Sequence, residues 1–324
     1  MRTITLGKTG LEVSRIAFGT WQVGGDWGAF DEQRAIAAVN HARELGINFF
    51  DTAQGYGFGT AEELLGNALR NELRGNRDEL VIATKGGINP GAERPRDARG
   101  DYLRKGVESS LRHLGIDYID LYQVHWPDSL TPAEETAGAL QELVDAGKIR
   151  HAGVSNYNAA QLAEFDAVRP VETLQPPYHL LRRGVETDVL PYTREHNIGV
   201  LAYSPLASGL LTGTWDQNVQ FDPDDWRSQA SGFHGDKLRT NVAVVERLKA
   251  LAADRGVSVS QLSLAWVLAQ TGVHVAIVGA RRRDSIENSA VAADIDLTAE
   301  DLTAIERIVA DAVPVEGATP EGVD

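Results

Sequence analysis

Short apolar runs alternate with longer amphipathic segments along nearly the whole chain. The apolar runs have the length and composition of buried strands. They span residues 14–20, 47–52, 80–85, 118–125, 149–156, 171–178, 198–206 and 273–280. Segments with apolar residues at helical spacing follow them. These helical segments span residues 31–46, 60–73, 101–115, 132–147, 158–168, 185–197, 241–256, 258–272, 283–293 and 299–312.

This alternation predicts one fold class. Strands that alternate with helices form parallel sheets. Eight strand–helix units in 324 residues suit a closed (β/α)8 TIM barrel. We expect a single barrel domain over residues 1–324, with an N-terminal hairpin near 2–13 and extra helices at the C-terminus. The segment 207–238, rich in Gly, Asp and Trp, is expected to be an insertion loop, and 314–324 a flexible tail.

Charge and composition narrow the range of partners. The net charge is −15 and there is no cysteine. A strongly negative charge disfavours nucleic acid and anionic membranes as partners. The lack of cysteine excludes disulfides, zinc–thiolate sites and thiol nucleophiles. No apolar run approaches the roughly 20 residues that span a bilayer, and the start MRTITLGKTG lacks the apolar part of a signal peptide. We therefore expect a cytoplasmic protein.

The barrel prediction directs attention to the carboxyl ends of the strands, where such folds place their functional residues. Asp51 and Tyr56 follow the second strand, Lys85 ends the third and His125 ends the fourth. Further candidates lie at the ends of the other strands: Thr20, Trp21, Ser155, Asn156, Gln175, Tyr203, Ser204, Gly279 and Arg281.

The stretch FFDTAQGYGFGTAEELLG, residues 49–66, could be read as a glycine-rich phosphate loop. A Rossmann loop needs the pattern GxGxxG and an acidic residue at the end of the next strand. Here the glycines are Gly55, Gly57 and Gly59, and the next strand ends in Lys85. The glycines are better explained as a sharp turn that presents Tyr56. The helix that follows is expected to begin with a capping box of Thr60 and Glu63.

Acid–base chemistry explains the four strand-end residues better. A lysine ammonium beside a tyrosine favours the phenolate, so the phenol can donate a proton near neutral pH. A neutral histidine can hydrogen-bond the same substrate oxygen. Each residue also has a structural explanation: Asp51 could cap a helix, Lys85 could form an ion pair, and His125 could be a core histidine. All four together at successive strand ends favour carbonyl reduction.

At these residues the sequence resembles the aldo-keto reductase family. The opening LGKTGLEVSRIAFGTW, the second-strand stretch, IATKGG and LYQVHWPD are all similar to segments of that family. The resemblance implies that Asp51, Tyr56, Lys85 and His125 are catalytic. The HWPD form is similar to the bacterial and potassium-channel-β-subunit-like members. The family implies reduction of aldehydes and ketones by direct hydride transfer from NADP(H), with NAD(H) the less favoured cofactor.

The resemblance also implies how the cofactor lies across the barrel mouth. GVSNY and TLQPPYH place Ser155, Asn156 and Gln175 at the nicotinamide carboxamide, and AYSPLASGLLTG places Tyr203 on the nicotinamide ring. IVGARRRDSIENSA is similar to the adenosine-phosphate segment, although Asp284 adds an unfavourable charge there and Val278 replaces a frequent proline. The full expected cofactor set is Thr20, Trp21, Asp51, Ser155, Asn156, Gln175, Tyr203, Ser204, Leu206, Ser208, Leu210, Gly279, Arg281, Ser285 and Asn288.

Aromatic residues near the strand ends suggest the substrate. Trp21, Trp27, Phe58 and Trp126 are expected to line a pocket for an apolar or aromatic aldehyde or ketone, although each could also be a core or surface aromatic residue. The insertion 207–238, with Trp215 and Trp226, is either a lid over the cofactor or a loop ordered by a neighbouring subunit.

Two other functions remain open at this point. One is an NADPH-binding sensing or interaction module with weak reductase activity, as in channel β subunits. The other is a metal-dependent hydrolase that uses Asp51 and His125, although no HxH or HExxH pattern supplies a metal site and we expect no metal. The physiological substrate, the direction of the reaction and the oligomeric state, a homo-oligomer included, are left open.

Overall fold

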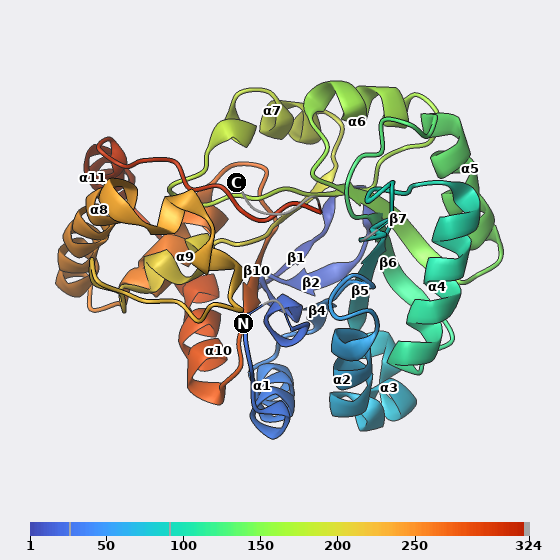
Figure 1. Cartoon of the computed structure of the whole chain (residues 1–324), viewed down its shortest axis with the longest axis horizontal. Coiled ribbons are helices and arrows are strands. Elements are labelled where there is room, and N and C mark those ends of the chain that lie inside the picture. The colour runs from blue at the N-terminus through green and yellow to red at the C-terminus, as the bar shows by residue number, and fades with distance from the viewer. Residues whose placement is uncertain (26, 91, 321–324) are drawn as a thin grey trace.

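The computed structural model describes residues 1–25, 27–90 and 92–320. Its centre is a closed barrel of eight parallel strands, surrounded by helices (Figure 1). The strands are β3 (Ile16–Gly19), β4 (Phe49–Asp51), β5 (Val81–Gly86), β6 (Ile119–Val124), β7 (Ile149–Ser155), β8 (Thr173–Gln175), β9 (Gly199–Ala202) and β10 (Val275–Gly279). They follow one another around the barrel, and β10 pairs with both β3 and β9. The predicted (β/α)8 fold is confirmed.

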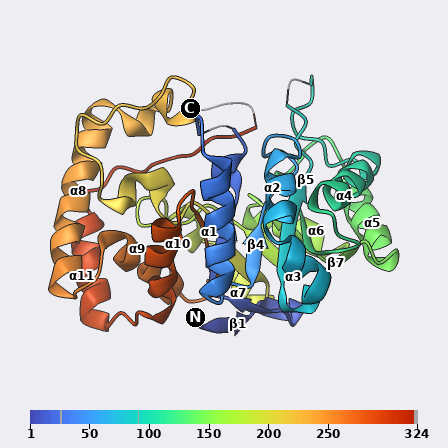
Figure 2. The same ribbon diagram turned by 90° about the horizontal axis from the view of Figure 1, so that it is seen from below.

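The N-terminal hairpin closes the barrel at one end. Strands β1 (Thr3–Thr5) and β2 (Glu12–Ser14) pair antiparallel, with a short turn between them. Leu6 of this turn is fully buried and packs against Gly199 at the start of β9, where any side chain on the glycine would collide with it. Figure 2 shows β1 at one end of the barrel and the gold segment that leads into α8 at the other. The hairpin therefore plugs the amino ends of the strands and leaves the carboxyl ends as the mouth.

Two apolar layers hold the barrel together. Alternate strand residues point inward, because successive side chains in a strand face opposite sides. The inner layer consists of Leu6, Val13, Ala17, Phe49, Val81, Ala83, Leu121, Leu201, Val275 and Ile277. The outward-facing residues pack against the helices in a larger second layer that includes Phe18, Phe50 and Ile82. The barrel interior is thus a packed core.

The helices agree with the predicted order. They are α1 (Glu32–Glu44), α2 (Thr60–Ala68), α3 (Arg70–Gly75), α4 (Gly100–Leu114), α5 (Ala133–Asp145), α6 (Ala159–Asp166), α7 (Val189–Glu195), α8 (Gly235–Asp254), α9 (Val259–Ala269), α10 (Arg283–Ala290) and α11 (Ala299–Val309). The helix expected over 60–73 is divided at Leu69 into α2 and α3. The capping box is wrong: Gly59 is the N-cap, and the Thr60 hydroxyl donates to the Gly57 carbonyl instead.

The segment 207–238 is ordered by its aromatic residues. Short 3-10 turns at Ala207–Thr212, Trp226–Ser228 and Ser231–Phe233 interrupt it. The rings of Trp215, Phe221 and Phe233 lie within 5.1 to 6.0 Å of one another. The insertion therefore has an apolar cluster of its own.

The prediction of a flexible tail over 314–324 is wrong for the first residues of that segment. Val315 is buried and its amide donates to the Leu181 carbonyl at 3.1 Å, while Glu316 pairs with Arg182 at 2.7 Å. Burial of Val315, its backbone hydrogen bond and the Glu316 ion pair together anchor the start of the predicted tail. The part of the predicted tail at 321–324 lies outside the described residues. Within the described part of the chain, no helix combines the length and apolar character needed to cross a bilayer.

A buried histidine near the mouth makes stability depend on pH. His179 is buried, and its Nδ1 accepts a hydrogen bond from the Leu181 amide at 3.1 Å. Burial lowers the pKa of His179 to about 3, and the nearby Arg182 charge adds to this shift. In the unfolded chain a histidine has a pKa of about 6.5. Stability from the neutral imidazole is therefore present above about pH 6.5 and is lost as the pH falls toward 3.

We expect this residue to account for about 2 kcal/mol of stability loss between about pH 7 and pH 5. Urea unfolding of the wild type and of His179→Gln at both pH values measures it. The variant is expected to have a lower free energy of unfolding than the wild type at both pH values. The change in this free energy between the two pH values should be smaller in the variant. An unchanged difference would show that His179 is not the titrating group.

Candidate active site

Three strand ends bring the four predicted residues together at the barrel mouth. Lys85 of β5 is fully buried, and its Nζ lies 2.6 Å from Asp51 Oδ1, 2.8 Å from the Thr52 carbonyl oxygen and 3.4 Å from the Tyr56 hydroxyl. The His125 ring lies 5.7 Å from the Tyr56 ring, edge to face. The ammonium thus sits among oxygens, with the Tyr56 hydroxyl as its most distant partner.

Glycines let the loop after β4 present Tyr56. A side chain on Gly24 would lie 3.0 Å from Tyr56, and one on Gly57 would lie 2.6 Å from the Gly24 carbonyl oxygen. Gly57 and Gly59 have φ angles of 67° and 111°, which favour glycine. The positive φ angles agree with the predicted sharp turn at Tyr56, and the glycines also allow close packing against this residue.

Burial sets the charge states of the site. Burial raises the pKa of Asp51, while Lys85 and a hydrogen bond from Gln175 Nε2 at 2.9 Å oppose this shift. Burial likewise lowers the pKa of Lys85 against the attraction of Asp51. Burial, with the Lys85 charge, lowers the pKa of His125 well below its ordinary value. His125 is therefore neutral near neutral pH, and its buried Nδ1 has no hydrogen-bond partner among the described residues.

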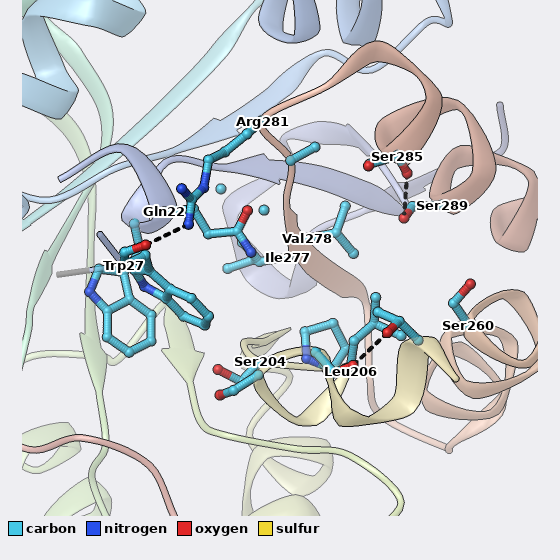
Figure 3. A pocket seen from close by; sticks show the side chains of 18 of the residues that line it. Gln22, Trp27, Ser204, Leu206, Ser260, Ile277, Val278, Arg281, Ser285 and Ser289 are labelled. Carbon is cyan, nitrogen blue, oxygen red and sulfur yellow. Dashed lines mark hydrogen bonds between the residues drawn. The ribbon is translucent and has the colours of Figure 1, made fainter. Parts of the chain in front are cut away.

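A cavity of about 820 Å³ runs from Tyr56 across the mouth to α10. Figure 3 shows Ser204 and Leu206 on one side, Arg281 and Ser285 on the other, and Ile277 and Val278 between them. The expected cofactor residues that line it are Thr20, Trp21, Asp51, Gln175, Tyr203, Ser204, Leu206, Ser208, Gly279, Arg281, Ser285 and Asn288. Its size is within the usual range of small-molecule and cofactor sites.

Hydrogen bonds fix the polar residues behind the catalytic end. The Tyr203 hydroxyl donates to Asn156 Oδ1 at 2.8 Å, and Asn156 Nδ2 donates to the His125 carbonyl oxygen at 2.9 Å. The Ser155 hydroxyl donates to the Gln175 carbonyl oxygen at 2.8 Å. Ser155 and Asn156 do not line the cavity as it stands, but they lie directly behind residues that do. Burial raises the pKa of Tyr203 well above the ordinary value, so its phenol stays protonated.

Comparisons with known proteins decide the family. Residues 15–310 match the Aldo/keto reductase family. The chain belongs to the aldo/keto reductase family. The aldo-keto reductase YhdN of Bacillus subtilis is 40% identical over 99% of this chain and 98% of its own. A glycerol dehydrogenase structure from Gluconobacter oxydans matches with a TM-score of 0.87, at 39% identity and 98% coverage of both chains.

Two further relatives show how widely the family's functions differ. The NADH-specific methylglyoxal reductase of Escherichia coli is 34% identical over 94% of this chain and 97% of its own. A probable voltage-gated potassium channel subunit beta of Arabidopsis thaliana is 36% identical over 95% of this chain and 97% of its own. The family name and the relatives named as reductases or dehydrogenases indicate oxidoreductases that use nicotinamide cofactors on small carbonyl compounds, and the channel subunit is a different use of the same fold. This membership favours an oxidoreductase over the metal-dependent hydrolase. Among the described residues there is no group of three His, Cys, Asp or Glu able to hold a metal ion.

Besides Ser155 and Asn156, three more residues that were expected to contact cofactor or substrate do not line the cavity of this aldo-keto reductase. The Leu210 side chain is buried in the apolar core, because the chain turns at Ser208 and Gly209 with positive φ angles. Phe58 is 54% exposed at the tip of the glycine loop. Trp126 stacks under the Arg96 guanidinium, 4.7 Å from its ring centre. These three placements depend on loop paths that strand ends alone do not reveal.

The sequence analysis missed Arg227. This arginine of the insertion lines the cavity, donates to the Ser208 carbonyl at 2.9 Å and pairs with Asp225. Its guanidinium also lies 4.6 Å from the Trp27 ring centre. The neighbouring Trp226 stacks on Trp21 at 5.8 Å. A lone arginine among the aspartates and tryptophans of 207–238 was the only available signal. The insertion thus forms one side of the cavity.

The residues present fit a nicotinamide dinucleotide. The cavity is elongated, with a buried acid–base cluster at one end and the Arg227 and Arg281 cations farther along. At the α10 end, Asn288 Nδ2 donates to the Ser260 hydroxyl at 2.8 Å, which orients its amide beside the cavity. Arginine side chains match the phosphates of such a ligand. Asn288, Ser285 and Arg281 would hold the adenosine part, and Gln175 and Tyr203 the nicotinamide part.

Proposed function

We propose that this aldo-keto reductase reduces aldehydes and ketones to alcohols with NADPH, and that Tyr56 is the proton donor. The main support for this proposal is the position of the Tyr56 hydroxyl, which lies 3.4 Å from the buried Lys85 ammonium at one end of the cavity. An ammonium beside a phenol favours the charged phenolate, which makes the phenol a better acid. At Tyr203 burial outweighs the charge of the nearby Arg182 and raises the pKa, so that phenol stays protonated.

Each of the other three residues has a distinct role in this proposal. Asp51 holds Lys85 through a contact of 2.6 Å and is itself held by Gln175. Neutral His125 faces the Tyr56 ring and is able to donate a hydrogen bond to the substrate carbonyl oxygen. When bound, the nicotinamide supplies the hydride. The proton that completes the alcohol comes from the Tyr56 hydroxyl.

The substrate class follows from the aromatic residues beside Tyr56. Trp21 stacks on Tyr56 at 6.3 Å and meets Trp27 edge to face at 5.1 Å. Aromatic pairs contribute about 0.5–1.5 kcal/mol beyond the area that they bury. We therefore propose aromatic or apolar carbonyl compounds as substrates. Phe58 and Trp126 remain candidates for the outer rim only.

Replacing Trp21 with alanine tests this substrate class. We expect the KM for para-nitrobenzaldehyde to rise about tenfold, because the aromatic contact is lost. The KM for propanal, which is too small to span the same contact, should change much less. Steady-state kinetics with both aldehydes measures the difference. An equal rise for the two would assign Trp21 to the cofactor instead of the substrate.

The proposed preference for NADPH over NADH depends on how the protein contacts the 2′-phosphate. Arg281 lines the cavity near α10, where a 2′-phosphate would meet it. The Escherichia coli relative is named as NADH-specific, so family membership alone does not select NADPH. The alternative function is an NADPH-binding sensing module, which the channel subunit relative makes worth testing.

The deciding experiment combines binding and turnover. Quenching of tryptophan fluorescence by NADPH and NADH gives the two dissociation constants, and nicotinamide absorbance then follows turnover with a panel of aldehydes and ketones. Tight NADPH binding with turnover supports the reductase. Binding without turnover of any carbonyl compound would favour the sensing module. Binding of neither nucleotide would overturn the cofactor assignment.

A further inference from the structure

Three consecutive arginines lie near the α10 end of the cavity, and each is already engaged. Arg281 donates to the carbonyl oxygens of Ala29 at 3.0 Å and Trp27 at 2.8 Å. Arg282 donates from Nε to Asp284 Oδ1 at 3.1 Å. Arg283 contacts Glu44 at 3.2 Å and does not line the cavity. The run of positive charge seen in the sequence is therefore much weaker at the cavity itself.

Among the residues that the structure describes, Asp284 is the one carboxylate that lines this end of the cavity. Its Oδ1 accepts from Arg282 Nε and also from the backbone amide of Ser285 at 3.0 Å. Both donors also line the cavity, and both are groups that a phosphate placed there would use. The Asp284 carboxylate thus occupies both hydrogen-bond donors. It also places a negative charge beside the position that a phosphate would take.

We propose that Asp284 determines the nucleotide selectivity of this protein. The carboxylate weakens binding of nucleotides with a 2′-phosphate and leaves those with a free 2′-hydroxyl unaffected, so both NADPH and NADH serve as cofactors. This inference rests on the proposed function. Asp284 is 70% exposed at its side chain, so solvent screens the repulsion. Removing this screened repulsion is then expected to change the ratio of the NADPH and NADH dissociation constants about fivefold.

The variant Asp284→Asn tests the proposal by binding alone. Isothermal titration calorimetry gives the dissociation constants of NADPH, NADH, adenosine 2′,5′-bisphosphate and ADP. We expect the two ligands with a 2′-phosphate to bind about fivefold more tightly to the variant, and the other two to change less than about twofold. The gain should shrink at high salt, because ions screen exposed charges.

Glu287→Gln is the matched control. Glu287 lies on the same helix, one turn further on, but it faces His41 at 3.6 Å and does not line the cavity. Its removal changes the net charge equally and should leave the selectivity unchanged. Equal tightening of all four ligands in Asp284→Asn, or the same gain in Glu287→Gln, would overturn the role of Asp284. Failure of the wild type to bind either dinucleotide would instead refute the proposed function.

Discussion

Replacing Tyr56 with phenylalanine is expected to lower kcat for carbonyl reduction by about three orders of magnitude, the usual contribution of a general acid. The ring remains, so its stacking on Trp21 and its edge contact with His125 are kept. Only the hydroxyl next to Lys85 is removed. Single-turnover measurements with saturating NADPH isolate this loss from product release.

Nucleotide binding provides the control for this prediction. Fluorescence titration should give NADPH dissociation constants within about twofold of each other for the wild type and Tyr56→Phe, because the aromatic contacts are unchanged. A variant that retains more than about a tenth of the wild-type kcat would show that another group donates the proton. Tyr203→Phe is a useful companion, since its hydroxyl only supports Asn156 and its loss should be much milder.

Replacing Lys85 with methionine is expected to reduce both stability and activity. The substitution leaves the Asp51 carboxylate buried without its cation, and breaking a buried ion pair costs about 3–5 kcal/mol. Urea unfolding should therefore show a clearly lower midpoint. Activity should also fall sharply, because no charge remains to favour the Tyr56 phenolate.

A double variant separates the two effects. In Asp51→Asn/Lys85→Met both charges are gone, and the asparagine side chain still accepts the hydrogen bond from Gln175. Replacing a whole buried ion pair is often close to neutral for stability. We expect the double variant to regain most of the lost stability and none of the activity. Recovery of activity with stability would mean that Lys85 acts only as a structural partner of Asp51.

Much of the site could be predicted from the sequence, because barrel topology collects strand ends. Asp51, Lys85 and His125 lie at the ends of β4, β5 and β6, so closure of the barrel alone brings them together. The structural alternative for Asp51 is wrong: its carboxylate accepts from Lys85 and Gln175 and caps no helix. The catalytic roles of the four residues stay predictions until they are measured.

Residues on long loops were harder to assign. Leu210 and Ser208 lie two positions apart, yet only Ser208 lines the cavity, because positive φ angles at Ser208 and Gly209 turn the chain between them. Arg227 lies far along the insertion and reaches the cavity because Trp226 stacks on Trp21. No local pattern reports a contact between segments about 200 residues apart.

Local patterns in the amino-acid sequence were sufficient to predict the barrel, the order of its elements and the residue types at its mouth. The reason is physical: strand and helix periodicities are local, and eight such units close in only a few ways. Which charged side chains remain free to bind a ligand is seen only in the folded protein. Arg281 is tied to the loop after β3, and Arg282 is neutralised by Asp284. A charge counted in the sequence becomes a binding group only if folding leaves it unpaired, and that depends on contacts between distant segments.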